Sequence, residues 1–559
     1  MLGEGELRTP VLIVGAGPVG LSLATDLGWR GVPNILIDQG SPGDRLTHPR
    51  MDNVGIRTME FARRWGIVGK IENAGFPRDL PLSIVYATGV LGHELARDTA
   101  PDKNSAVPPL FSPQKHELCP QNFFDPVLQA AAGSFAGNTL LYGHRLVGLA
   151  QDDDGVRATV EISGEAAPVE IRADYLAACD GAGSVSAEML GLAPSQSRVL
   201  ACSTNIFLRC PELAARTAGR RAYRYILIGP DGTWGSMVNI DGRDVWRLQL
   251  LGSDEWPQWT DAEIHGFIRR GIGCDLPYDI LSWVPWSRRE MVVDRYRAGR
   301  CFLVGDSAHQ LSPTGGYGMN TGIAEAVDLS WKLAAAIEGW GGDALLDSYD
   351  AERRPVAIRN VLQGSANLAA MRSAPASPLI LSAGPEAEAA RAEIGRTIQK
   401  AMHREWRSFG IHLGAIYADS PIIPVEDRDA PEQDVAQFVQ SAVPGARAPH
   451  IWLSEDRSTL DLFGDGFVLL DFGSGPDGGI DGLMNAAADR HVPLRCEGIR
   501  HAEAARLYQR RFVLVRPDGH IGWRGDRMPD DPHALIDLLR GAAPIDLSSS
   551  QTNHRENVS

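Results

Sequence analysis

A glycine-rich segment near the start of the chain, G-A-G-P-V-G at residues 15–20, has the residue types that hold a phosphate group against a backbone. It follows an apolar run at 10–14 and opens a helical pattern, the context in which the G-x-G-x-x-G spacing is informative. Gly15 allows a tight turn, Gly17 lets a pyrophosphate approach the backbone, and Gly20 lets helix and strand pack closely. Because a helix N-terminus binds anions, this segment predicts a dinucleotide site.

A second apolar run, at 34–38, ends in an acidic residue. Asp38 lies 18 residues after Gly20, a distance suited to binding a ribose hydroxyl. The same glycine spacing recurs as G-S-G-P-D-G at 473–478, but no acidic strand end follows it, and we interpret it as a loop. The bare fingerprint therefore does not separate NAD from FAD.

Later glycine-rich segments favour FAD. C-D-G-A-G-S at 179–184 and G-D-S-A-H at 305–309 each follow an apolar run, and P-T-G-G-Y-G-M-N at 313–320 leads into a long helix. An aspartate fixed at a strand end can bind ribitol hydroxyls. A glycine-rich turn entering a helix directs N–H groups and a positive dipole end at its ligand, which suits the negative charge of reduced flavin.

These motifs need a parallel sheet to bring them together, and the chain has several short apolar runs that can form one. The runs lie at 10–14, 34–38, 174–179 and 300–305. With a helix between the first two, they predict an α/β fold. Residues 200–255 alternate polar and apolar side chains, which predicts a half-exposed antiparallel sheet. Helical patterns then cover 322–337, 344–372 and 386–409, and a small terminal α/β region has strands at 467–472 and 512–515.

Composition excludes several classes of function. The chain has 559 residues, with 54 Lys and Arg against 70 Asp and Glu, a net charge of −16. This charge repels phosphate backbones and anionic lipid surfaces, so neither nucleic acid nor a membrane is expected as a partner. Seven cysteines with no C-x-x-C indicate neither a disulfide scaffold nor a zinc ribbon, and they favour a cytoplasmic protein. No other histidine has metal-ligand spacing to His309, so no metal site is predicted.

The combined motifs resemble those of the single-component FAD-dependent aromatic hydroxylases, the family of p-hydroxybenzoate hydroxylase and phenol hydroxylase. The resemblance is greatest to bacterial phenolic and polyketide hydroxylases that have a thioredoxin-like C-terminal domain. It implies that NADPH or NADH reduces the flavin and that O2 adds at its C4a carbon. The resulting hydroperoxide would hydroxylate a phenolic, possibly polycyclic, small molecule. A homodimer is compatible with this resemblance.

The resemblance also assigns roles to individual residues. The ADP half of FAD would be held by Gly15, Gly17, Pro18, Gly20, Asp38 and Gln39. Arg50 and Gln121 would lie near its phosphates, Asp180 would serve both FAD and NADPH, and Asp306 would bind the ribityl chain. The flavin itself would be bordered by Pro313, Gly316, Gly318, Met319 and Asn320, with Pro313 next to the site of oxygen reaction.

Asp52, in the segment H-P-R-M-D at 48–52, matches the position where phenol hydroxylase has an aspartate beside the substrate hydroxyl. Such a carboxylate would assist deprotonation of a phenol, since the phenolate is the better nucleophile. The alternative is a capping or ion-pairing aspartate between Arg50 and Arg57. Aromatic residues of the 191–289 region, Tyr223 among them, either line a substrate pocket or pack in the sheet.

The resemblance implies an FAD-binding domain interrupted by a substrate domain, followed by two further regions. The FAD-binding domain would comprise 1–80, 116–190 and 290–372, and the β-sheet substrate domain 81–115 and 191–289. A helical connector at 373–430, a thioredoxin-like domain at 431–545 and a disordered tail at 546–559 would follow.

The sequence departs from the family pattern at three places. Gln39 stands where many relatives have arginine, Ala187 replaces an arginine of the Asp-Gly motif, and the terminal domain contains only Cys496. The lost arginine makes NADPH use less secure than FAD binding, and a dithiol role is excluded. Three alternatives stay open: a Baeyer–Villiger or epoxidising monooxygenase, a flavin-holding protein without turnover, and an NAD-dependent dehydrogenase. A flavin halogenase is disfavoured because no W-x-W-x-I-P follows the fingerprint.

Overall fold

The computed structural model describes residues 7–44, 47, 49–426, 430–473 and 479–542. The chain divides into two units. The first comprises Met1–Ala326, Val356–Gly414 and Gln433–Phe438, and the second comprises Val327–Pro355, Ala415–Glu432 and Val439–Ser559. Both contain helices and strands, so the predicted α/β class is confirmed. The predicted tail at 546–559, and all but Gly473 of the second glycine motif, lie outside the described residues.

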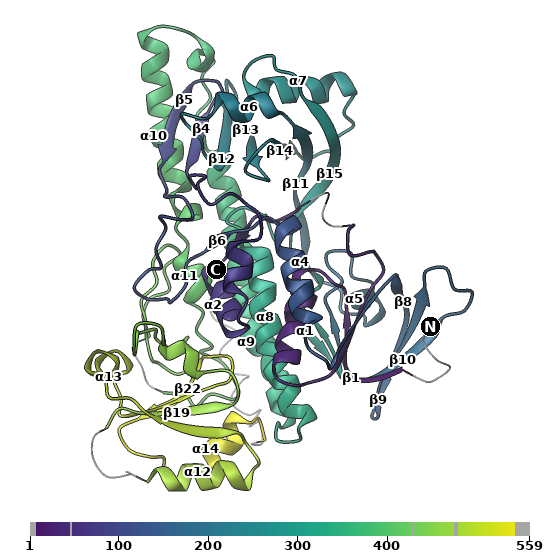
Figure 1. The fold of residues 1–559 in the computed structure, drawn as a ribbon, viewed down its shortest axis with the longest axis vertical. Coiled ribbons are helices and arrows are strands. Elements are labelled where there is room, and N and C mark those ends of the chain that lie inside the picture. The colour runs from purple at the N-terminus through teal and green to yellow at the C-terminus, as the bar shows by residue number, and fades with distance from the viewer. Residues whose placement is uncertain (1–6, 45–46, 48, 427–429, 474–478, 543–559) are drawn as a thin grey trace, which may run out of the picture. The chain divides into compact units, whose positions relative to one another are not determined.

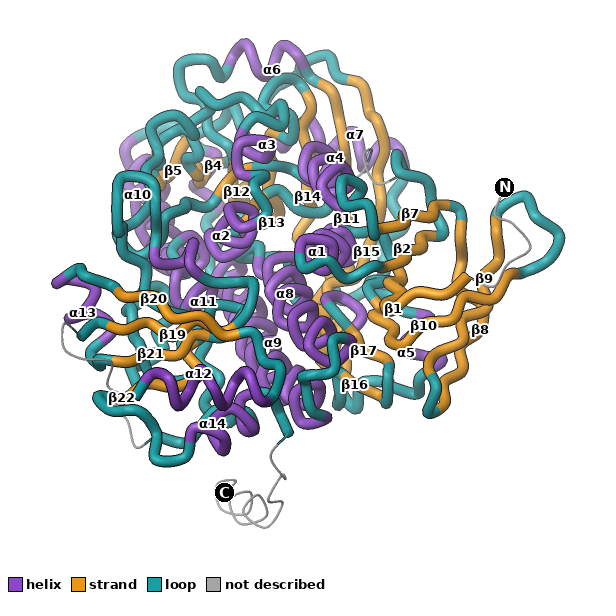
Figure 2. The backbone as a smooth tube through the Cα atoms, turned by 60° about the horizontal axis from the view of Figure 1, so that its bottom comes forward, coloured by secondary structure: helices purple, strands orange, loops and turns teal. Residues whose placement is uncertain are grey.

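The first sheet of the first unit carries the fingerprint. Its order is β16–β17–β10–β1–β2–β7, with β9 beside β10 and β8 beside β9, and neighbours from β17 to β7 run parallel. The bounds are β1 (Leu7–Val14), β2 (Asn34–Asp38), β7 (Asn138–Tyr142), β8 (His144–Asp152), β9 (Gly155–Ile162), β10 (Val169–Ala178), β16 (Arg297–Ala298) and β17 (Cys301–Leu303). Helix α1 (Pro18–Trp29) lies beside β1 and β2 (Figure 2). Val11, Leu12 and Ile13 are fully buried, as expected for a parallel strand covered on both faces.

The second sheet has the order β18–β15–β11–β14–β13–β12–β4–β5. Its strands are β4 (Ile84–Ala87), β5 (Glu94–Asp98), β11 (Ser197–Arg209), β12 (Arg224–Gly229), β13 (Gly232–Asn239), β14 (Val245–Ser253), β15 (Asp279–Val292) and β18 (His309–Gln310). Helix α7 (Asp261–Ile272), which begins with a Thr260 capping box, packs Ile264 and Ile268 against one face, on Trp246 and Leu248.

The prediction that this sheet is half-exposed is wrong. The polar side chains alternate with the apolar ones as predicted, but they are buried too, with Arg247 only 5% and Ser203 0% exposed. Alternation sends Arg247 to the face opposite Trp246 and α7, and there its guanidinium bonds residues of the 49–52 segment. A polar face covered by other parts of the chain cannot be distinguished from a solvated one by periodicity.

Helices then lead out of the sheets. They are α8 (Tyr317–Ile337), α9 (Asp343–Arg372), α10 (Pro385–Trp406) and α11 (Phe409–Leu413), and α10 runs alongside β4 and β5 (Figure 1). Helix α8 begins five residues before the predicted start, directly after Gly315 and Gly316, whose φ values are +88° and +69°. The predicted helix over 386–409 ends earlier, at Trp406. The remaining elements of the first unit are β3 (Asn53–Val54), β6 (Glu117–Leu118), α2 (Ile56–Arg64), α3 (Val68–Glu72), α4 (Gln121–Ala132), α5 (Val185–Met189) and α6 (Pro211–Arg216).

The second unit has a small sheet in the order β20–β19–β21–β22, in which β19 is parallel to β20 and antiparallel to β21. Besides the parts of α8 and α9 within 327–355, its α-helices and strands are β19 (Phe467–Asp471), α12 (Ile480–Asp489), β20 (Leu494–Gly498), α13 (Ala502–Tyr508), β21 (Phe512–Val515), β22 (Ile521–Gly525) and α14 (Pro532–Leu539). The strands predicted near 467 and 512 are confirmed. No helix among the described residues has the length and apolar character to span a membrane.

Candidate active site

The three glycines of the fingerprint have different structural roles. Gly15 has φ +106°, and a Cβ there would lie 2.4 Å from the carbonyl oxygen of Cys179. A Cβ on Gly20 would lie 2.0 Å from the Gly15 oxygen, so both glycines are required by packing. A Cβ on Gly17 meets nothing within 4 Å. Gly17 is also the N-cap of α1, and among the described residues no side chain accepts a hydrogen bond from the first N–H groups of this helix. The space in front of the helix N-terminus therefore fits a phosphate.

Asp38 lies at the end of β2 and is bonded to the backbone of the glycine turn. Its carboxylate accepts hydrogen bonds from Ala16 N–H at 2.7 Å and Gly40 N–H at 2.8 Å. Asp38 is buried, whereas Gln39 is exposed. The structure therefore assigns Asp38 a turn-fixing role, in addition to the ribose contact that the sequence predicts.

Gln121, the first residue of α4, fixes the segment that leads to Asp52. Its carboxamide oxygen accepts a hydrogen bond from Arg50 N–H at 2.9 Å, and its nitrogen donates to Asp125 at 3.1 Å. The Arg50 side chain is exposed. His48 of the same motif lies outside the described residues.

Asp180 and Asp306 each follow a buried strand, as predicted, and the two strands, β10 and β17, are parallel neighbours. Asp180 accepts hydrogen bonds from Ser184 Oγ at 2.6 Å and Ser186 N–H at 3.0 Å, so it fixes the start of α5. Asp306 is exposed, in a 3₁₀ turn (Gly305–Ser307).

A buried contact between Glu325 and His309 holds that turn. The Glu325 carboxylate accepts a hydrogen bond from Gly305 N–H at 2.8 Å and lies 3.1 Å from His309 Nε2. Both side chains are fully buried. The pair therefore fixes the backbone from which the exposed Asp306 carboxylate projects.

The loop before α8, residues 312–316, is held by bonds to other elements. Thr314 Oγ1 donates to the Gly364 oxygen of α9 at 2.7 Å, and Gly315 N–H donates to Glu405 of α10 at 3.1 Å. Pro313 is exposed. Gly318 and Met319, in the first turn of α8, are half-buried.

Asn320 connects α8 to the segment after Asp52. Its side-chain oxygen accepts hydrogen bonds from Gly55 N–H and Thr58 Oγ1, both at 2.7 Å. Its nitrogen donates to the oxygens of Asn53 and Gly316. The carboxamide is thus engaged by the protein, so Asn320 shapes this turn rather than presenting its own side chain to a ligand.

Asp52 is the centre of a buried charged cluster. Its Oδ2 accepts hydrogen bonds from the Tyr223 hydroxyl, from Arg224 at 3.1 Å and from Arg247 at 3.2 Å. Burial raises the pKa of Asp52, but Arg224 and Arg247 outweigh it and the net pKa is lowered. Asp52 is ion-paired, as the structural alternative expected, but the partners shown are Arg224 and Arg247, and Arg57 pairs with Glu60. The sequence did not indicate Arg224 or Arg247, which lie more than 170 residues away along the chain.

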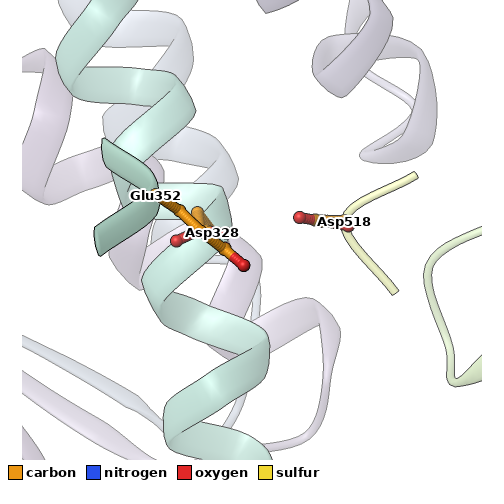
Figure 3. Close-up of side chains that lie close together, drawn as sticks. All are labelled: Asp328, Glu352 and Asp518. Atoms are coloured by element: carbon orange, nitrogen blue, oxygen red, sulfur yellow. The ribbon is translucent and has the colours of Figure 1, made fainter. Parts of the chain in front are cut away.

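The second unit contains a separate cluster of carboxylates, Asp328, Glu352 and Asp518, whose oxygens lie within 4.8 Å of one another (Figure 3). Lys332 Nζ lies 2.8 Å from Asp328 and 2.7 Å from Glu352, and Arg516 bonds Glu352 and Asp518 at 2.6 and 2.7 Å. A metal ion would have to displace these cations. We therefore interpret the cluster as an internal ion-pair network.

The residues of the first unit fit FAD. Open space faces Gly17 and the α1 N-terminus, which would take the pyrophosphate, and an exposed Asp306 carboxylate would meet the ribityl chain. The 312–316 loop and the first turn of α8 would border the flavin.

Comparison with known proteins agrees with this fit. The family model described as "FAD binding domain" matches residues 8–364, and the one described as "Aromatic-ring hydroxylase, C-terminal" matches residues 441–542. A putative polyketide hydroxylase of Streptomyces halstedii is 34% identical, over 93% of this chain and 94% of that protein. The solved structure of the rebeccamycin biosynthetic enzyme RebC with reduced flavin has a TM-score of 0.88 at 40% identity, covering 96% of this chain and 100% of that one. The flavin-dependent monooxygenase PieE, in complex with FAD and substrate, has a TM-score of 0.82 at 28% identity, covering 96% and 98%.

Proposed function

The chain belongs to the FAD-dependent aromatic-ring hydroxylases, and we propose that it hydroxylates a phenolic ring of a polycyclic small molecule. Its family membership confirms the predicted FAD cofactor and monooxygenase activity, and it favours these over an NAD-dependent dehydrogenase. The polyketide hydroxylase among its relatives supports a polycyclic substrate. The domain boundaries, the homodimer and the cytoplasmic location stay predictions.

The observation that carries this proposal is the charge of the cluster around Asp52. Two guanidinium groups and one carboxylate leave a net charge of +1 in a buried environment. A nearby positive charge favours the phenolate form of a phenol. When bound and reduced by a nicotinamide cofactor, FAD would activate O2 as an electrophilic oxygen donor, which an electron-rich ring can attack.

This arrangement does not favour the predicted role of Asp52, which was to assist deprotonation of a phenol. A carboxylate whose pKa is already lowered is a weak base. We infer that Asp52 is a positioning residue, which holds Arg224, Arg247 and the Tyr223 hydroxyl in place. The two arginines then stabilise the substrate oxygen as it loses its proton.

The first experiment is a visible spectrum of the purified protein, followed by NADPH and NADH oxidation with a panel of phenols and naphthols. We expect the bands of oxidised flavin and NADPH oxidation that a phenol stimulates. A colourless protein that cannot be reconstituted with FAD would contradict the proposal. NMR of the product separates hydroxylation from Baeyer–Villiger and epoxidation chemistry.

Charge changes in the cluster should move the pKa of a bound phenol in opposite directions. Arg224→Met should raise the pKa of bound 4-nitrophenol by about one unit or more, because it removes a cation. Asp52→Asn should lower it, because it removes an anion. Spectrophotometric titration of the FAD-loaded protein measures both.

The control is Arg221→Met, which removes an arginine that pairs at the surface with Asp79. It should leave the pKa of the bound phenol unchanged. An Asp52→Asn protein that leaves the pKa of the bound phenol unchanged, or raises it, would contradict the positioning role, because Asp52 would then not act as an anion beside the two arginines.

A further inference from the structure

Glu405, in the last turn of α10, is a buried carboxylate to which the mechanism above assigns no role. The residue is only 4% exposed. One carboxylate oxygen, Oε1, accepts the hydrogen bond from Gly315 N–H. The other, Oε2, is buried and has no hydrogen-bond partner in the described part of the chain.

Glu405 lies between the 312–316 loop, which would border the flavin, and the charged cluster around Asp52. Gly315 belongs to the 312–316 loop, and the positive charge of Arg224, which bonds Asp52, acts on the Glu405 carboxylate. The Arg224 guanidinium also lies 5.7 Å from the ring of Trp406, the next residue of α10. Helix α10 thus presents adjacent residues to both parts of the site.

The neighbouring cations do not satisfy Oε2. Arg288, 1% exposed, donates to Ser203 Oγ at 2.8 Å, Gln249 Oε1 at 2.9 Å and Ser312 Oγ at 3.5 Å. Arg224 donates to Asp52 and Tyr223. Burial raises the pKa of Glu405 to about 7, although Arg224, Gly315 N–H and Arg288 oppose it. A buried acceptor without a donor costs free energy, which a ligand donor would recover.

We propose that Glu405 determines substrate specificity, by accepting at Oε2 a hydrogen bond from an O–H or N–H group of the aromatic substrate. The donor is a second polar group, distinct from the phenol oxygen near Arg224 and Arg247. The enzyme therefore selects aromatic substrates that carry two separated polar groups. This inference rests on the proposed function, because it assumes a phenolic substrate beside the flavin loop.

The test compares two probes, 1,5-dihydroxynaphthalene and its monomethyl ether, 5-methoxy-1-naphthol, which lacks one donor. Their binding to the FAD-loaded protein is followed by the change in flavin absorbance. Above about pH 8, where the Glu405 carboxylate is ionised, the natural protein should bind the diol about tenfold or more tightly than the ether, since a hydrogen bond to a charged group is lost. Glu405→Gln keeps an acceptor for Gly315 but places an NH2 group at the second position, so the preference should disappear.

Glu388→Gln, an exposed change on the same helix, is the matched control and should keep the preference. Glu405→Asp, which retains the charge, should keep a reduced preference and serves as the second variant. Equal binding of the two probes by the natural protein would overturn the proposal, as would an unchanged preference in Glu405→Gln. Loss of FAD in both Glu405 variants would also overturn it, because Glu405 would then only hold the flavin loop. Absence of flavin from the natural protein would instead contradict the proposed function.

Discussion

Gly17→Val should give a protein that folds normally but binds FAD about 10- to 100-fold more weakly. A Cβ at Gly17 meets no protein atom within 4 Å, and its φ of −74° suits any L-residue. The added side chain therefore fills only the space expected for the pyrophosphate. Loss of one hydrogen bond to a charged phosphate, about 1.5–3 kcal/mol, corresponds to this loss of affinity. Titration of the apoprotein with FAD, followed by flavin fluorescence, measures it.

Gly20→Val provides the contrast, because its Cβ would lie 2.0 Å from the Gly15 oxygen. This variant should be destabilised before any cofactor is added, which thermal unfolding of the apoprotein detects. Normal FAD affinity in Gly17→Val would show that the pyrophosphate lies elsewhere.

Arg516→Met should lower the free energy of unfolding of the second unit by about 3–5 kcal/mol, because removing one partner leaves uncompensated buried charge. Arg516 is completely buried and bonds Glu352, Asp518 and Asp328. Although burial raises the pKa of Glu352, Arg516 and Lys332 outweigh it and lower the pKa to about 2, so this carboxylate stays ionised. Denaturant unfolding of the FAD-loaded protein provides the measurement.

Arg510→Met is the control for that change. Arg510 pairs with Asp526 at 2.9 Å on the surface of the same unit, with 44% of its side chain exposed. Such pairs contribute little, and the expected cost is below about 1 kcal/mol. If both substitutions lowered the free energy of unfolding equally, the buried network would contribute no more to stability than a surface ion pair.

Local sequence patterns predicted the strand ends and glycine-rich turns to which the cofactor site is assigned. The glycine spacing, the apolar run before it and the acidic end of β2 are all close in sequence, so each could be recognised from one short segment. The Gly305–Asp306 turn and the glycine-rich segment that leads into α8 could also be recognised from one short segment each. Periodicity likewise placed β19 and β21.

The charged cluster around Asp52 was harder to predict from the sequence, because its members lie far apart along the chain. Asp52 was identified, but Arg224 and Arg247 come from strands of another sheet, and no local signal distinguishes them from surface arginines. Glu405 lies in a helix whose pattern predicted only a connector. Its significance depends on the burial of one oxygen, which only the three-dimensional structure provides.

The make-up of the second unit limits how this enzyme can be recombined with its relatives. Residues 327–355, from α8 and α9, belong to that unit, and they supply Asp328, Lys332 and Glu352 to the cluster that Arg516 and Asp518 complete. A chimaera joined near residue 439 would combine one parent's residues at 328, 332 and 352 with the other parent's residues at 516 and 518. Exchange of residues 327–355 together with the C-terminal region would keep the whole network from one parent, with crossover points near 327 and 355 as well as near 439.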